Sequence, residues 1–226
     1  MSMPFYVSPE QVMKDRAEYA RKNIARGRDL VAIECEPGIV LVADNPSRTL
    51  SKISEIYDRI AFAAVGKYNE FQMLKVAGVR HADMKGYSYS REDVSARELA
   101  YAYAQTLGGV FTHEMKPYEV ELLVAEVGED PSANELYHIF YDGVVIDEQH
   151  FSVLGGHAES IGEALREQYR DGLTLAEAVQ LGARVLGNGA EPLGTDRLEV
   201  ALLERARPRR TFRKIRGEEL SSLLGA

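Results

Sequence analysis

The segment LVAIECEPGIVLVA, residues 30–43, contains two apolar runs on either side of Pro37-Gly38. Apolar runs that flank a Pro-Gly turn signal predict two strands joined as a hairpin. A further apolar run over 60–65 follows the hairpin and ends at Gly66. Strands therefore come in adjacent groups, which is typical of an α+β protein rather than of a doubly wound sheet.

The remaining predicted elements continue this grouping. Two helices follow Gly66, one from about Lys67 and one with Ser95 at its N-cap and Glu98 three residues later. The order of elements predicts two packed sheets covered by helices on both outer faces. Further strands are expected over 118–127, 135–141, 151–154, 198–203 and 211–215, and further helices over 155–169, from 174 and from 218.

A helix with a well-marked start precedes the hairpin. Ser8 stands at its N-cap, Pro9 at its first position and Gln11 at its third, which predicts a capping box. Apolar residues then recur at helical spacing until Gly27 supplies a stop. The residues up to Tyr6 lie outside this helix and are expected to be mobile.

Length and composition predict one cytoplasmic domain. The 226 residues contain no internal repeat and no low-complexity linker. No apolar run approaches the roughly 18–20 residues needed to cross a bilayer, and the first residues lack signal-peptide features. The single cysteine, Cys35, cannot form an intrachain disulfide, which fits a reducing compartment. We therefore expect no membrane partner.

The net charge of −8 argues against nucleic acid as the main partner. A basic cluster near the end of the chain is the one feature that favours it. The alternative is that these residues lie on the outward faces of two neighbouring strands, solvated or against an acidic neighbouring subunit. The basic cluster consists of Arg205, Arg207, Arg209, Arg210, Arg213, Lys214 and Arg216.

The sequence predicts no catalytic residue, no metal site and no cofactor. Gly155-Gly156 before a predicted helix resembles a phosphate cradle, but its spacing matches neither a Walker motif nor a dinucleotide fingerprint, so a tight turn is favoured. The five histidines lack the spacing of metal ligands on one element. Cys35 has no adjacent histidine, and no serine has the flanks of a nucleophile elbow.

Several short segments together resemble one family. They are EYAR at 18–21 on the first helix, SKI at 51–53 and AAVG at 63–66, with Ser8-Pro9 at the helix cap and KPY at 116–118. Each motif alone is weak, but their order and spacing agree with the predicted elements. Over essentially the whole chain the sequence resembles the α-subunits of 20S proteasomes of the bacterial, actinobacterial type.

This resemblance implies the four-layer αββα sandwich of the N-terminal-nucleophile hydrolases, with an extra N-terminal helix. It implies a non-catalytic subunit that forms heptameric rings with its own copies and caps rings of proteasome β-subunits. Residues 1–7 would be a mobile gate segment and 8–226 a single domain, with Phe5, Tyr6, Ser8 and Pro9 at the gate and helix cap. The implied activator is a ring-shaped ATPase, or another protein, that inserts C-terminal tails.

The resemblance also implies an activator-docking pocket at Lys52, Gly66 and Glu18. A lysine suits a terminal carboxylate because it is a mobile point charge with three donors. Gly66 would let a peptide backbone approach closely, and Glu18 would accept a donor from the incoming tail. The plainer alternative makes them a solvated loop lysine, a strand terminator and an exposed helix residue.

Two differences from the family pattern matter for function. Many α-subunits carry a tyrosine-aspartate-arginine gate motif, whereas this chain has Phe5-Tyr6-Val7, so their closed-gate geometry is not carried over. The early sequence also lacks the glycine-threonine junction that exposes a β-subunit's nucleophile, and Gly194-Thr195 comes too late. The alternative from the enzyme class is an active N-terminal-nucleophile amidohydrolase of the same fold, which would need a processed N-terminal Thr, Ser or Cys.

Overall fold

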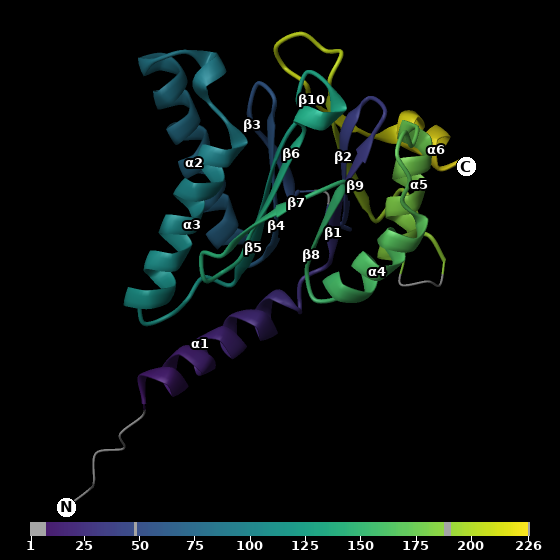
Figure 1. Ribbon diagram of the computed structural model, residues 1–226. Coiled ribbons are helices and arrows are strands. Elements are labelled where there is room, and N and C mark those ends of the chain that lie inside the picture. Colours follow the sequence, from purple (N-terminus) through teal and green to yellow (C-terminus); the bar gives the residue numbers. More distant parts are fainter. Residues whose placement is uncertain (1–7, 48, 188–190, 226) are drawn as a thin grey trace, which may run out of the picture.

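A computed structural model describes residues 8–47, 49–187 and 191–225 and arranges them in four layers (Figure 1). Two five-stranded sheets lie at the centre, and all neighbouring strands within each sheet are antiparallel. Helices cover the outer face of each sheet, and one further helix crosses an end of the sandwich. The predicted α+β class and αββα arrangement with an extra N-terminal helix are confirmed.

The first sheet has the strand order β10-β9-β2-β1-β8 and contains the predicted hairpin. Leu30 pairs with Ala43, and Cys35 pairs with Gly38 at the turn. The strand pair expected at the end of the chain joins the same sheet, beside β2. The strands are β1 (Leu30–Cys35), β2 (Gly38–Asp44), β8 (Phe151–Leu154), β9 (Leu198–Glu204) and β10 (Phe212–Ile215).

The second sheet has the order β3-β4-β5-β6-β7, and two of its strands were not predicted. The strands β3 and β7 lie at opposite edges of this sheet and alternate or expose their side chains, so neither contains a continuous apolar run. The strands are β3 (Ile53–Tyr57), β4 (Ile60–Gly66), β5 (Val120–Glu126), β6 (Glu135–Ile139) and β7 (Val145–Glu148).

The helices begin close to their predicted caps. Ser95 Oγ accepts from the N–H of Glu98, and Thr174 with Glu177 forms a complete capping box. The α-helices are α1 (Pro9–Ile24), α2 (Tyr68–Ser88), α3 (Ala96–His113), α4 (Ala158–Gln168), α5 (Leu175–Leu186) and α6 (Gly217–Leu224), with short 3-10 turns at Arg91–Asp93 and Pro131–Ala133.

The capping box predicted at the first helix forms only in part. Ser8 Oγ accepts from the N–H of Gln11 at 3.2 Å, with Pro9 at the first helical position, as expected. The side chain of Gln11, however, donates to Asp15 Oδ1 at 2.6 Å, one turn further along α1. The carboxylate of Asp15 is a strong acceptor within reach on the same helix face, and it draws the Gln11 amide away from the N–H of Ser8, from which the amide oxygen would accept in a capping box.

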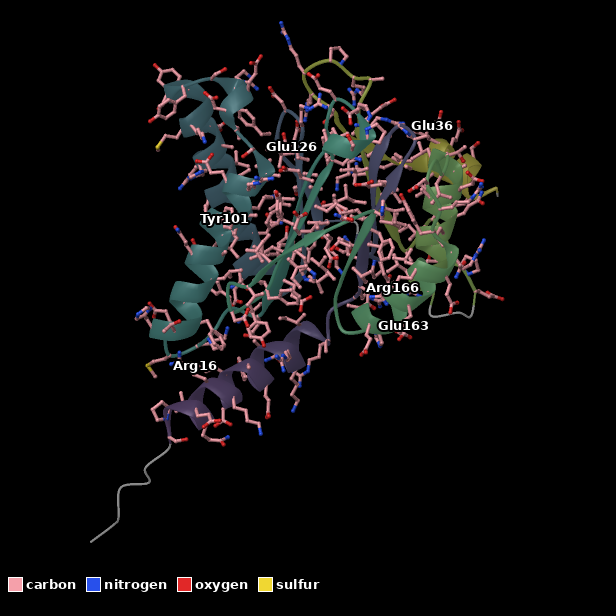
Figure 2. All side chains as sticks on the ribbon, in the orientation of Figure 1. Arg16, Glu36, Tyr101, Glu126, Glu163 and Arg166 are labelled. Carbon is pink, nitrogen blue, oxygen red and sulfur yellow. The ribbon has the colours of Figure 1, made fainter. Side chains whose placement is uncertain are left out.

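Three apolar layers hold the sandwich together, and Figure 2 shows side chains filling the space between the sheets and beneath the helices. The middle layer lies between the two sheets, and α1 contributes Ala20 and Ile24 to it. The outer layers lie between the first sheet and α4, α5 and α6, and between the second sheet and α2 and α3. Full burial of a large apolar side chain contributes about 1.5–3 kcal/mol, so these layers dominate the stability of the domain.

The helix α1 is fastened across one end of the sandwich. Its buried Ala20 and Ile24 close the middle layer, and Arg16 Nη1 donates to the carbonyl oxygen of Phe111 at the end of α3, at 2.6 Å. Figure 2 shows Arg16 on the side of α1 that faces α3. The segment 27–29 that follows α1 lies beside the end of β4, since a Cβ at Gly27 would be 2.9 Å from the side chain of Val65.

Candidate functional site

Lys52 lies immediately before β3, on the connection from the first sheet to the second. Its carbonyl oxygen accepts from the N–H of Ala64 at 3.2 Å, which continues the pairing of β3 with β4. Its ammonium donates to the carbonyl oxygen of Arg28 at 2.6 Å. Lys52 is therefore partly buried between the start of β3 and the segment that follows α1.

Gly66 ends β4, two residues beyond the partner of Lys52, so the fold brings these two predicted residues together. Its φ is +115°, and a Cβ there would lie 2.0 Å from the carbonyl oxygen of Glu119. The backbone that approaches Gly66 in the structure is thus the protein's own. The glycine is required by the pairing of β4 with β5, whether or not a foreign peptide also approaches it.

Glu18 lies on α1 and is exposed. It precedes Gly27 by more than two helical turns, so it stands away from the junction where Lys52 and Gly66 meet. Among the described residues, no hydrogen bond or ion pair joins Glu18 to either of them. One copy of the chain therefore assembles two of the three predicted docking residues and presents the third on a neighbouring surface.

Only two of the four residues predicted for the gate and helix cap lie within the described residues. Ser8 and Pro9 form the start of α1 as predicted. Phe5 and Tyr6 lie outside the described residues.

The ammonium of Lys52 has an unusual electrostatic environment. Burial lowers the pKa of Lys52 to about 8, although the carboxylates of Asp44, Asp29 and Glu199 act to raise it. Arg28 lowers the pKa further because its like charge disfavours the ammonium. Lys52 therefore carries a positive charge at neutral pH that an additional carboxylate would stabilise.

The acids around Lys52 are themselves held in place. Asp44 accepts from Arg28 Nη1 at 2.9 Å and from Arg197 Nη2 at 2.5 Å. Asp29 accepts at 2.9 Å from His157 Nδ1 and at 3.1 Å from the N–H of the same residue. These contacts hold the two carboxylates in place from the first sheet and from the start of α4, so their negative charges act on Lys52 from fixed positions.

The turn at Gly155-Gly156 belongs to this network and is not a phosphate cradle. Gly155 has a φ of +121°, and a Cβ there would lie 2.3 Å from Asp29 Oδ1. The N–H of Gly155 donates to Glu121 Oε2 at 3.3 Å, while Asp29 takes the N–H of His157. The N–H groups of Gly155 and His157 are thus occupied by the protein's own carboxylates, which supports the tight turn predicted here.

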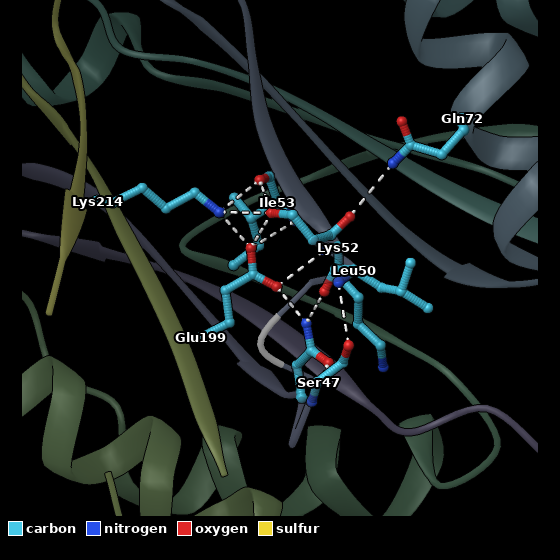
Figure 3. A network of polar contacts seen from close by, with 9 residues as sticks. Ser47, Leu50, Lys52, Ile53, Gln72, Glu199 and Lys214 are labelled. Carbon is cyan, nitrogen blue, oxygen red and sulfur yellow. Dashed lines mark hydrogen bonds and ion pairs between the residues drawn. The ribbon is translucent and has the colours of Figure 1, made fainter. Parts of the chain in front are cut away.

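Beneath Lys52, the carboxylate of Glu199 on β9 collects a set of hydrogen-bond donors (Figure 3). The successive N–H groups of Lys52 and Ile53 donate to its two oxygens, at 2.8 and 3.2 Å. Asn45 Nδ2 donates to Oε2 at 2.7 Å, and Ser51 Oγ and the ammonium of Lys214 donate to Oε1. We call Glu199, Lys214 and their partners on the connection 45–53 the Glu199 network.

Sequence reasoning missed the Glu199 network, although one signal pointed to it. Glu199 interrupts the apolar run 198–203, where alternate residues face the middle layer of the core. A carboxylate on the inner face of a predicted strand must be paired or hydrogen-bonded to be tolerated. The identity of its partners could not be read from the sequence, because they come from the connection between β2 and β3, from the first residue of β3 and from β10.

The basic cluster is largely paired within the chain. Arg210 binds Glu55 on β3, with Nε at 2.8 and 2.9 Å from the two carboxylate oxygens. Arg213 donates to Glu204 at 2.7 Å and to Glu219 at 2.5 Å. Arg205 Nη1 donates to the carbonyl oxygen of Gly128 at 2.7 Å. Guanidinium groups already paired with carboxylates and carbonyls favour the structural alternative over nucleic-acid binding.

The described part of the chain contains neither a membrane-spanning helix nor a cluster of metal-binding side chains. Within 8–47, 49–187 and 191–225, no helix is both long and apolar enough to cross a membrane. No three His, Cys, Asp or Glu side chains in the same ranges come together as a metal site would require.

Comparison with known proteins places this geometry in a family. The family described as "Proteasome subunit" matches residues 24–203. The chain is 59% identical to the proteasome subunit alpha of Kineococcus radiotolerans, over 99% of this chain and 98% of the relative. It is 57% identical to that of Thermobifida fusca, over 99% and 91%. With the proteasome subunit alpha of Mycolicibacterium vanbaalenii it shares 55% identity, over 99% and 91%.

The family match and these relatives agree with the fold. The match begins at the last residue of α1 and ends within β9, so it spans the second sheet, the first sheet apart from β10, and the helices α2 to α5. The relatives extend the similarity to α1 and to the last strand and helix. The chain therefore belongs to the proteasome subunit family and groups there with the actinobacterial α-subunits.

Proposed function

We propose that this chain is a non-catalytic subunit of the outer heptameric rings of a proteasome core particle, where it gates the admission of substrate and docks activators. In this proposal residues 1–7, which lie outside the described residues, are the gate segment, and residues 8–226 are the single α-type domain. The partners are further copies of the chain, β-type subunits, and a ring-shaped ATPase or other activator with C-terminal tails. The assembly works in the cytoplasm.

The docking function is carried by one observation, the placement of the Lys52 ammonium. It lies at the end of the sandwich that α1 crosses, partly desolvated, and uses one of its three donors on the carbonyl oxygen of Arg28. A tail carboxylate would accept from the remaining donors. Because the site is partly desolvated, this ion pair would be stronger than one in bulk water.

Glu18 and Gly66 complete the proposed pocket in different ways. Gly66 keeps the end of β4 free of a side chain beside Lys52. Glu18, exposed on α1, offers an acceptor to the backbone or side chain of an incoming tail. We place the tail between adjacent copies of the ring, with Lys52 supplying the charge that binds its carboxylate.

The enzymatic alternative finds less support. An N-terminal nucleophile has to lie at the free start of a processed chain, where its own amine acts as the base. In this chain α1 precedes β1, and the residues that join them between Ala25 and Asp29 include no Thr, Ser or Cys. Catalysis is therefore assigned to the β-type partner.

Deleting residues 1–7, with Ser8 kept as the first residue after the initiator, should speed hydrolysis of small peptides by the assembled particle. The segment precedes a firmly capped helix, so its removal opens the path without loosening α1. Keeping Ser8 matters because loss of an N-cap costs about 1 kcal/mol. Turnover of a fluorogenic peptide by full-length and truncated particles measures the effect, and equal rates would contradict a gating role.

Activator docking should weaken as the pH rises through about 8, the pKa of Lys52. Below this pH the side chain is an ammonium that pairs with the tail carboxylate, and above it a neutral amine. An ordinary lysine would keep its charge to about pH 10. Titration of docking between pH 6.5 and 9.5 tests this, with Lys52→Arg as the control that keeps its charge. Docking that is flat in pH for the wild type would contradict the assignment.

A further inference from the structure

The loop that presents Lys52 is held from below by the carboxylate of Glu199. Two successive peptide N–H groups, those of Lys52 and Ile53, donate to the two oxygens of this one group. Asn45 Nδ2 bridges Glu199 Oε2 and the carbonyl oxygen of Leu50, at 2.7 Å each, so both ends of the loop meet at the same carboxylate. The direction in which the Lys52 side chain leaves the loop is therefore set by Glu199.

This contact also joins the two sheets. Glu199 is part of β9 in the first sheet, opposite Ala43 of β2, whereas Lys52 leads into β3 in the second sheet. Figure 3 shows Glu199 and Lys214 reaching toward Lys52 and Ile53 from neighbouring strands on one side, with Gln72 of α2 on the other. A group anchored in the first sheet thus holds the backbone at the point where the chain enters the second sheet.

The charge of Glu199 is compensated by Lys214 of β10. Both side chains are mostly buried, with 12% of Glu199 and 20% of Lys214 exposed. Burial acts to raise the pKa of Glu199, but the ammonium of Lys214 and the donors of Ser51 and Lys52 hold it below its usual value. The Lys214 ammonium also donates to Ser51 Oγ at 2.6 Å and to the carbonyl oxygen of Ile53 at 2.8 Å.

We propose that Glu199, with Lys214 as its counter-ion, is the positioning residue of the Lys52 docking site, because it orients Lys52 and supplies part of the negative field that keeps its ammonium charged. The proposal rests on the docking function proposed for Lys52. It also gives one member of the basic cluster a defined role. Lys214 serves the docking site from within the fold, and no external polyanion is required.

The two members of the pair act on Lys52 with opposite sign. Removing the negative charge of Glu199 makes the Lys52 ammonium harder to form, and removing the positive charge of Lys214 makes it easier. If the two substitutions merely loosened the loop, the pKa of Lys52 would shift in the same direction in both variants. Other charged groups remain in place in either variant: Asp29, Asp44 and Arg28 around Lys52, and Lys75 and Arg216 around Lys214.

Competitive acetylation of assembled particles with acetic anhydride, followed residue by residue by mass spectrometry across pH, measures this directly. We expect the labelling midpoint of Lys52 to move down in Glu199→Gln and up in Lys214→Met. The matched control is Glu204→Gln. Glu204 also lies on β9 and pairs with Arg213, and among the described residues no hydrogen bond or ion pair joins its side chain to 45–47 or 49–53. It should leave the Lys52 midpoint unchanged.

Docking is read separately with a fluorescent synthetic peptide copied from the C-terminus of the host's proteasomal ATPase, with its C-terminal amide as the control. Glu199→Gln replaces hydrogen bonds to a charged carboxylate with weaker ones to an amide. We expect this loss of support for Lys52 to weaken binding of the peptide about tenfold. If Lys52→Ala leaves peptide binding intact, the docking function itself is wrong. If Lys52→Ala abolishes binding but Glu199→Gln changes neither binding nor the midpoint, the positioning role is wrong.

If Glu199→Gln does not assemble, Lys214→Met provides the test. In that variant Glu199 is present and keeps its four donor residues, which are Asn45, Ser51, Lys52 and Ile53. An upward shift of the Lys52 midpoint in this variant supports the proposal. An unchanged or lowered midpoint overturns it.

Discussion

Replacing Lys52 with alanine is expected to abolish docking of a tail-inserting activator, while the ring and its basal peptidase activity stay intact. A carboxylate that enters a partly desolvated site needs a positive partner. Truncation of one side of such a pair costs about 2–5 kcal/mol, or roughly 30-fold to several thousand-fold in affinity for each tail. Several tails engage one ring, so the losses multiply through effective concentration.

The measurement is activator binding to wild-type and Lys52→Ala particles at matched ionic strength, with a tail-deleted activator alongside. Lys52→Arg should restore docking incompletely, because a planar guanidinium requires more room than an ammonium. Lys85→Ala is the matched control, since Lys85 is ion-paired with Glu98 near the far end of α2. Binding by Lys52→Ala equal to wild type, with tail deletion still abolishing it, would place the tail elsewhere.

The second large effect concerns catalysis. The purified chain is expected to hydrolyse no peptides, and activity should appear only when it assembles with a β-type subunit. The physical reason is that a threonine protease needs both the hydroxyl and the free amine of an N-terminal threonine, and here α1 precedes the first strand. Without the nucleophile the chemical step cannot occur. The chain alone should therefore show only the background rate of peptide hydrolysis, whereas the co-assembled particle should be active.

Assays with a fluorogenic peptide on the chain alone, the partner alone and the co-assembled particle test this expectation. Covalent inhibition of the partner's threonine should remove all activity from the co-assembled particle. Intact-mass measurement of the chain provides the control for processing. Inhibitor-sensitive hydrolysis by the chain alone, together with a mass that reveals a new N-terminal Thr, Ser or Cys, would establish the enzymatic alternative instead.

Much of the fold could be predicted because local signals and burial agreed. The hairpin 30–43 and the strand that ends at Gly66 are buried along nearly their whole length, so their apolar runs were visible. The strands β3 and β7 were missed because each is an edge strand with only one neighbour, and its sequence is not a continuous apolar run. Edge strands are specified by pairing with a neighbour, which a single segment does not reveal.

The candidate site was predictable in part. The resemblance named Lys52 and Gly66 together, but the pairing of β3 with β4 that brings them close was not predicted, because β3 was missed. The need for glycine at position 66 arises from Glu119, more than fifty residues away. Lys52 is supported by Glu199, which is in turn paired with Lys214, and these contacts form only after both sheets are packed. Side chains that meet across two sheets leave no periodic signal in the sequence.

The central claim, that this chain forms the outer rings of a proteasome core particle, is tested most directly by electron microscopy of the particle purified after co-expression with its β-type partner. We predict stacked rings with seven-fold symmetry, in which this chain occupies the two end rings and α1 lies on the outer end face. Particles without seven-fold rings, or with this chain in the inner rings, would contradict the account.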